Sequence, residues 1–237
     1  MNADIYEIFN SVQGEGTSAG VRQVFVRFCG CQLQCEYCDT GAARVPAKRC
    51  RVFDRYIDNP LGVDAVIDAI DDLWTPATRS ISLTGGEPLL HCDFIGELAR
   101  GVSRPTYLET NAGLPDSARK IADHIDVAAC DIKLPEHRAT ADYDRLLDAE
   151  LATIEIFHAS GVETFVKIIV LPETTEKSIS GAVFGIKAID DSIPLVIQPV
   201  TPLSVDLCQL LDLMDFAGTH LSDVRMIPQL HRMIGIP

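Results

Sequence analysis

The sequence has no apolar stretch approaching the roughly 20 residues of a membrane span, and its first residues, MNADIYEIF, lack the basic and apolar regions of a secretion signal. Basic residues are also scarce, since 20 Lys and Arg against 34 Asp and Glu give a formal net charge of −14 at pH 7. Proteins that bind nucleic acid or anionic membranes in general need a basic face, so the composition argues against both classes. We expect a cytoplasmic protein that acts on a small molecule.

Internal repeats, low-complexity tracts and Pro/Gly-rich linkers are missing as well. A chain of 237 residues with 47% hydrophobic content can bury one full core. We therefore predict a single domain over residues 1–237.

Apolar runs of strand length alternate with segments of helical period. The strand-like runs are Val24–Phe28, Ile81–Leu83, Thr106–Leu108, Val127–Ala129, Phe165–Val170, Leu195–Ile197 and Val224–Ile227. Residues 63–74 have apolar side chains at i, i+3, i+4 and i+7, and weaker helical patterns cover 93–102, 142–158 and 205–216. This alternation predicts an α/β fold with a parallel sheet and right-handed crossovers, whose ligands bind at the carboxyl ends of the strands.

Four of the eight cysteines crowd between Cys29 and Cys38, which in a reducing compartment indicates a metal or cluster site. Cys31, Cys35 and Cys38 have CxxxCxxC spacing directly after the first apolar run. Three thiolates can bind three corners of a [4Fe-4S] cubane and leave one iron open to an external ligand. Such an iron can chelate the amino and carboxylate groups of S-adenosylmethionine (SAM) and cleave it reductively to a 5′-deoxyadenosyl radical.

Other assignments of the cysteines remain open. A zinc site is the structural alternative, although structural zinc normally takes four Cys or His ligands in two pairs and no second pair is present. Cys29 could replace Cys31, but it lies within the apolar strand. Core packing is the simpler explanation for Cys50, Cys92, Cys130 and Cys208.

Together with the turn Thr84-Gly-Gly-Glu-Pro88 after the next strand, the cysteine loop closely resembles the radical SAM superfamily. In that family the glycine turn presents backbone groups to the amino group of SAM, and glycine permits a close approach. The resemblance implies a partial (β/α) barrel, a SAM contact at Gly86, and contacts to adenine and cluster at Tyr37, Cys38 and Asp39.

A narrower resemblance, to the 7-carboxy-7-deazaguanine synthases, covers essentially the whole chain. It rests on the N-terminal segment 9–16, which contains QGEG, and on 25–31, 38–40, 108–113, 131–133 and 198–199. It implies a carbon–nitrogen lyase that converts 6-carboxy-5,6,7,8-tetrahydropterin to 7-carboxy-7-deazaguanine with release of ammonia, in queuosine or archaeosine biosynthesis. SAM acts catalytically there: its radical takes a hydrogen from carbon 6, the skeleton rearranges, and the hydrogen returns.

The same resemblance implies residue roles. The Thr40 hydroxyl binds Mg²⁺, a hard ion that prefers oxygen ligands, and the Arg27 guanidinium holds a substrate carboxylate. The other implied substrate contacts are Val12, Gln13, Gly14, Thr84 and the terminal carboxylate of Pro237. The other implied SAM contacts are Asp131, Ile132, Lys133 and Gln198. A homodimer and a flavodoxin- or ferredoxin-type electron donor are also implied.

Two competing functions remain open. A glycyl-radical activase would share the cluster loop and Gly86 but would not depend on Gln13, Arg27 or Pro237. A non-enzymatic iron–sulfur or zinc module would neither bind nor cleave SAM. Glu15 is either a pterin-binding carboxylate or a solvated turn residue, residues 42–59 have no assigned role, and no role is given to the histidines.

Overall fold

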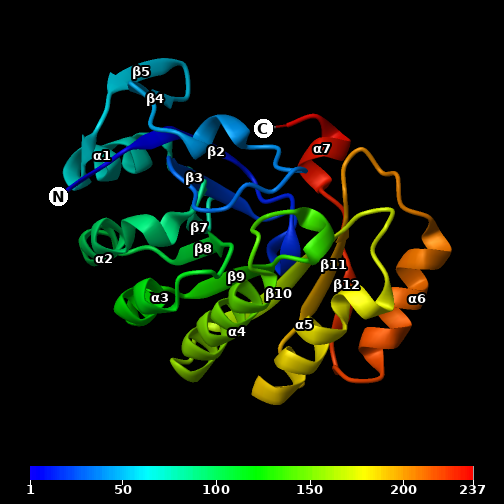
Figure 1. Ribbon diagram of the computed structural model, residues 1–237. Helices are drawn as coiled ribbons and strands as arrows, with labels where there is room; N and C mark the ends of the chain where they lie inside the picture. The colour runs from blue at the N-terminus through cyan, green and yellow to red at the C-terminus, as the bar shows by residue number, and fades with distance from the viewer. Residues whose placement is uncertain (237) are drawn as a thin grey trace.

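The computed structural model describes residues 1–236 of the chain (Figure 1). Its main sheet has strands in the order β12 (Val224–Met226), β11 (Leu195–Pro199), β10 (Glu163–Val170), β9 (Val127–Ile132), β8 (Thr106–Thr110), β7 (Ser80–Gly85), β3 (Arg22–Phe28), β2 (Ile5–Val12), β4 (Arg49–Val52) and β5 (Arg55–Asp58). A separate short pair joins β1 (Asn2–Ala3) to β6 (Leu61–Gly62).

The strands from β12 to β3 are parallel to one another, as the alternating pattern predicts. Each predicted apolar run coincides with one of them to within a residue, and the α/β prediction is confirmed. Residues on both faces of these strands are largely buried except in the edge strand β12, which explains why most of them are continuous apolar runs in the sequence.

Helices cover one face of the sheet (Figure 1). They are α1 (Val63–Leu73), α2 (Cys92–Gly101), α3 (Pro115–Ile121), α4 (Tyr143–Ala159), α5 (Glu176–Ile189) and α6 (Leu207–Gly218), while α7 (Leu230–Ile234) lies near the N-terminal segment. The main core lies between these helices and the sheet. The opposite face has a small apolar cluster around Tyr107 and Phe165. It also carries a cavity lined by both polar and apolar side chains.

Several elements were not predicted from the sequence. Strand β2 pairs antiparallel with β3 and carries the start of segment 9–16. Residues 49–58 form a hairpin, β4–β5, in which Arg51 forms an ion pair with Glu7. Helix α5 packs closely on α4, since a Cβ added at Gly185 would lie 2.4 Å from Leu151 Cδ1.

In residues 1–236, no helix has both the length and the apolar character needed to cross a bilayer. Cys208 lies exposed on α6, so its assignment to the core was wrong, whereas Cys50, Cys92 and Cys130 are buried as expected.

Candidate active site

The three cysteines of the CxxxCxxC loop line a cavity of about 640 Å³. Cys35 is buried, and Cys31 and Cys38 are half-buried. The loop is clamped by the turn after β9: the Gln34 N–H donates to the carbonyl oxygen of Ala139 over 3.1 Å, and the Glu36 N–H donates to that of His137 over 3.2 Å. These two backbone hydrogen bonds hold the cysteine loop against the turn that follows β9.

The thiols are neutral in the free chain, because burial raises the pKa of Cys31 and of Cys35, and a bound metal would have to displace their protons. All three cysteines line the same cavity, as the ligands of a cubane must, since each thiolate would bind a different iron.

The glycine turn after β7 packs directly on the start of the cysteine loop. The Gly86 N–H donates to the Phe28 oxygen over 3.0 Å, and a Cβ added at Gly86 would lie 1.9 Å from the carbonyl oxygen of Gly30. Only glycine fits at this position, because any side chain would collide with the backbone of the cysteine loop. Gly86 also lines the cavity, where its backbone is open to a ligand.

Glu87, which follows this turn, is a fully buried carboxylate that sequence reasoning missed. It accepts hydrogen bonds from the Leu89 N–H at 2.9 Å, the Thr110 hydroxyl at 2.7 Å and the Asn111 N–H at 2.7 Å. Burial raises its pKa to about 7 in spite of these bonds. Glu87 therefore ties the glycine turn to the end of β8.

The predicted SAM contacts on β9 and β11 form a polar wall. Lys133 Nζ lies 3.1 Å from Asp131 Oδ2 and 3.1 Å from the Tyr37 hydroxyl. Gln198 is fully buried, and both its amide nitrogen and its amide oxygen have no hydrogen-bond partner. A buried amide without partners is costly unless a ligand binds it, so this wall fits a polar cofactor.

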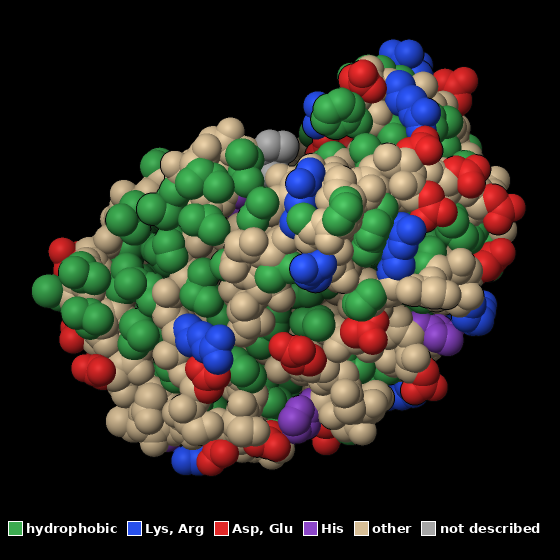
Figure 2. Space-filling model, turned by 180° about the vertical axis from the view of Figure 1, so that it is seen from behind, with side chains coloured by type: hydrophobic (Ala, Val, Ile, Leu, Met, Phe, Trp, Pro, Cys, Tyr) green, Lys and Arg blue, Asp and Glu red, His purple; other side chains and the backbone are tan. Residues whose placement is uncertain are grey.

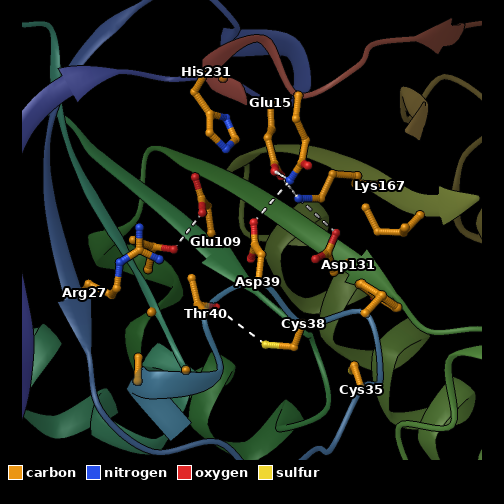
Figure 3. A pocket seen from close by; sticks show the side chains of 18 of the residues that line it. Glu15, Arg27, Cys35, Cys38, Asp39, Thr40, Glu109, Asp131, Lys167 and His231 are labelled. Atoms are coloured by element: carbon orange, nitrogen blue, oxygen red, sulfur yellow. Dashed lines mark hydrogen bonds and ion pairs between the residues drawn. The ribbon is translucent and has the colours of Figure 1, made fainter. Parts of the chain in front are cut away.

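A second buried cation lies deeper in the cavity. Lys167, on β10, forms ion pairs with Glu15 and, at 3.3 Å, with Asp131 (Figure 3). The Gln229 amide also donates to Glu15, over 2.6 Å. Burial alone would raise the pKa of Glu15, but Lys167 and Gln229 outweigh it and lower the pKa to about 2. Glu15 is therefore a cavity residue with a buried partner and not a solvated turn residue. The sequence feature that could have revealed the partner is Lys167 itself, a lysine inside an otherwise apolar strand.

The N-terminal segment forms another wall. Gln13 is buried and donates to Glu109 over 2.5 Å, and Glu109 also accepts from the Thr84 hydroxyl over 2.7 Å. Glu109 was not identified from the sequence. Val12 and Gly14 line the same cavity.

Arg27 lies on the cavity side of β3, as predicted. Its Nε is 3.0 Å from Glu7 Oε1, its guanidinium carbon is 5.7 Å from the centre of the Phe9 ring, and its side chain is only 18% exposed. This placement differs from that of an ordinary surface arginine, because the guanidinium is held by one carboxylate and an aromatic ring and still reaches the cavity.

The C-terminal segment completes the cavity. Arg232 forms an ion pair with Asp39 at 2.9 Å, and the Leu230 N–H donates to the Gly14 oxygen over 2.8 Å. His231 lines the cavity near Glu109 (Figure 3). Thr40 Oγ1 lies 3.6 Å from Cys38 Sγ.

The structure brings almost all of the predicted site residues together around this one cavity. Ile132 is the exception, because its side chain packs in the helix-side core. Pro237 lies outside the described residues.

Known proteins resemble this chain in sequence and in fold. The model of the Radical SAM superfamily matches residues 25–183. A 7-carboxy-7-deazaguanine synthase of Methanothermobacter thermautotrophicus is 40% identical over 100% of this chain and 98% of the relative, and one of Geobacter sulfurreducens is 37% identical over 98% and 97%. The crystal structure of QueE from Escherichia coli covers 98% of this chain and 95% of its own, with a TM-score of 0.65 at 18% identity, which shows the same fold.

Proposed function

Because the chain belongs to the radical SAM superfamily and, within it, to the 7-carboxy-7-deazaguanine synthases, we propose that it converts 6-carboxy-5,6,7,8-tetrahydropterin to 7-carboxy-7-deazaguanine. The ring contraction expels one nitrogen as ammonia, so the reaction is that of a carbon–nitrogen lyase. The observation that carries the proposal is the convergence of the cysteine loop, the glycine turn and the segment 12–14 on one cavity.

In this proposal Cys31, Cys35 and Cys38 hold three corners of a [4Fe-4S] cluster. When bound, the cluster and SAM supply the electron and the 5′-deoxyadenosyl radical that start the reaction. The backbone at Gly86 and Ile132 and the side chains of the polar wall orient SAM. These side chains are Tyr37, Asp39, Asp131, Lys133 and Gln198.

Gln198 has the clearest role among them. Its buried amide offers one donor group and one acceptor group that the protein leaves unused. Adenine and ribose present complementary groups, so binding SAM removes the desolvation cost that the free protein carries.

The substrate is held on the opposite side of the cavity. Arg27 offers a guanidinium edge to the substrate carboxylate. The backbone of Val12 and Gly14 and the groups of Gln13 and Thr84 bind the pterin ring, and Glu109 fixes both Gln13 and Thr84 through its two oxygens. The terminal carboxylate of Pro237 is proposed to reach the same substrate.

Thr40 is proposed to bind Mg²⁺ through its hydroxyl oxygen, with substrate oxygens and water as further ligands. The same hydroxyl can donate its proton to the Cys38 sulfur, since a hydroxyl has one donor and two lone pairs. A Mg²⁺ ion held by Thr40 would orient the substrate and offset its negative charge.

The remaining parts of the proposal concern partners and location. A cytoplasmic homodimer and a flavodoxin- or ferredoxin-type electron donor are inferred from the resemblance, as is a place in queuosine or archaeosine biosynthesis. Exposed apolar side chains at Leu203, Leu207, Leu211 and Met226 support a self-association surface beside α6 and β12, and Figure 2 shows hydrophobic side chains gathered on that side. The relatives span the full chain and are synthases by name, so an activase and a non-enzymatic module are set aside.

The deciding experiment is anaerobic incubation of the cluster-reconstituted protein with SAM, a reductant, Mg²⁺ and 6-carboxytetrahydropterin, followed by mass analysis. We expect 7-carboxy-7-deazaguanine without stoichiometric loss of SAM. Accumulation of 5′-deoxyadenosine without this product would support the radical SAM chemistry but refute the proposed substrate. Intact SAM beside a reduced cluster would refute both.

A further inference from the structure

Asn111, the first residue after β8, places its side-chain amide beside the sulfur of Cys31. Asn111 Nδ2 lies 3.7 Å from Cys31 Sγ, which is within hydrogen-bond range because sulfur is larger than oxygen. The side chain is buried, with 7% of the residue exposed. No role for this residue follows from the spacing of the cysteines or from the glycine turn.

The orientation of this amide is determined by the backbone. Asn111 Oδ1 accepts a hydrogen bond from the Gly113 N–H at 3.0 Å, and a backbone N–H can only donate. Rotating the amide by 180° would set its NH₂ group against that N–H. The oxygen must therefore face Gly113, and the NH₂ group must face Cys31.

Two further contacts hold Asn111 in place. Its backbone N–H donates to Glu87 Oε2 over 2.7 Å, which fixes the residue to the glycine turn. Its side chain forms a reciprocal amide pair with Gln32, with distances of 2.9 and 3.3 Å. By contrast, the Thr40 hydroxyl near Cys38 can rotate, so the structure does not fix its proton in the same way.

We propose that Asn111 is a built-in hydrogen-bond donor to the Cys31 thiolate and raises the reduction potential of the cluster. The proposal rests on the proposed function in one respect, since it takes Cys31 as a cluster ligand. A donor to a ligand sulfur stabilises the more negative, reduced cluster, and hydrogen bonds to sulfur are among the factors that set iron–sulfur potentials. In a protein with a net charge of −14, such a donor makes the cluster easier for the electron donor to reduce.

The test compares cluster potentials of reconstituted proteins without SAM or substrate, by redox titration followed by electron paramagnetic resonance. Asn111→Ala removes the donor, and we expect the equilibrium constant for reduction to fall by up to about tenfold, which is 59 mV for one electron. Asn111→Asp, in alkaline buffer, keeps the oxygen that accepts from Gly113 but turns a second, negative oxygen toward Cys31. Its potential should be lower still.

Gln32→Ala is the control, because it removes one partner of Asn111 and leaves the bond from Gly113 that orients the amide. It also removes the Gln32 oxygen 3.9 Å from Cys31 Sγ, which cannot donate to a thiolate, so its potential should not fall below that of the unchanged protein. If Asn111 merely stabilises the loop, Asn111→Asp will restore the potential that Asn111→Ala loses, and the proposal is overturned. An unchanged potential in Asn111→Ala overturns it as well.

Failure of the proposed function is recognised separately. Cys31→Ala should prevent assembly of a three-cysteine [4Fe-4S] cluster, as measured by iron and sulfide content. If Cys31→Ala assembles the same cluster, the ligand assignment falls. If Cys31→Ala does not assemble the cluster and all Asn111 variants have the same reduction potential, only the proposed role of Asn111 is refuted.

Discussion

Replacement of Lys167 by methionine is expected to destabilise the ligand-free protein at neutral pH by about 3 kcal/mol, at the lower end of the range for breaking a buried ion pair. The Lys167 side chain is 9% exposed and that of its partner Glu15 is 17% exposed. Lys167 also forms an ion pair with Asp131 at 3.3 Å. Without the ammonium group, two carboxylates would face each other in a largely dry part of the cavity.

The magnitude follows from the titration of Glu15. Burial raises the pKa, but the charge and hydrogen bond of Lys167 and the hydrogen bond of Gln229 lower it from 4.5 to about 2. A pKa difference of about 2.5 corresponds to about 3 kcal/mol. Because the pKa is lower in the folded state, this stabilisation is fully present above pH 4.5 and is lost as the pH falls toward 2.

The assay is urea unfolding of the metal-free protein, followed by circular dichroism at neutral pH and at several lower pH values. Arg119→Met is the control, because its ion pair with Asp116 joins side chains that are 64% and 96% exposed and should contribute less than about 1 kcal/mol. Adding Glu15→Gln to Lys167→Met should restore part of the loss. If Lys167→Met and the unchanged protein have the same unfolding free energy and the same pH dependence, the reasoning is refuted.

Three further predictions concern the ligand sites. Gln198→Leu should stabilise the SAM-free protein by about 1 kcal/mol, since it removes a buried amide without partners. The same substitution should weaken SAM binding about tenfold in equilibrium dialysis. A less stable protein with unchanged SAM binding would contradict both the stability prediction and the binding prediction. Gly86→Ala should lower both cluster content and SAM binding because the added Cβ would meet the Gly30 oxygen at 1.9 Å, and normal values of both would show that the turn can move. Thr40→Ala should weaken activity and alter its dependence on Mg²⁺ concentration, whereas unchanged rates at every Mg²⁺ concentration would remove Thr40 from the metal site.

The sequence was most informative about the parallel sheet. Runs such as Leu195–Ile197 are apolar because both faces of the strand are buried, and this can be recognised without knowing which residues pack against them. Strand β2 was harder to recognise, because Glu7 and Asn10 interrupt its apolar residues. Their hydrogen-bonding partners lie on other elements: Arg27 and Arg51 for Glu7, and Arg22, Leu73 and Thr78 for Asn10. In α5, Gly181 and Gly185 weaken the helical signal, and only packing on α4 explains them.

Some residues of the site could likewise be predicted from the sequence and others could not. Residues in motifs were predicted because the loops after parallel strands gather at one edge of the sheet. Lys167 was missed because it is a single polar residue in an apolar run, and its partner Glu15 is 152 positions away. Glu109 lies in the motif 108–113, but its role depends on Gln13, which is 96 positions away. Asn111 belongs to a motif, but its contact with Cys31 depends on a backbone bond that spacing alone does not reveal.

The contacts of the C-terminal segment with Gly14, Glu15 and Asp39 have a consequence for how the protein is made. The cysteine loop and the glycine turn leave the ribosome well before residues 229–232, at a synthesis rate of roughly 5–20 residues per second. One wall of the cavity therefore arrives last. Until residues 229–232 pack against Gly14, Glu15 and Asp39, the cavity lacks this wall and is more open to solvent than in the folded protein.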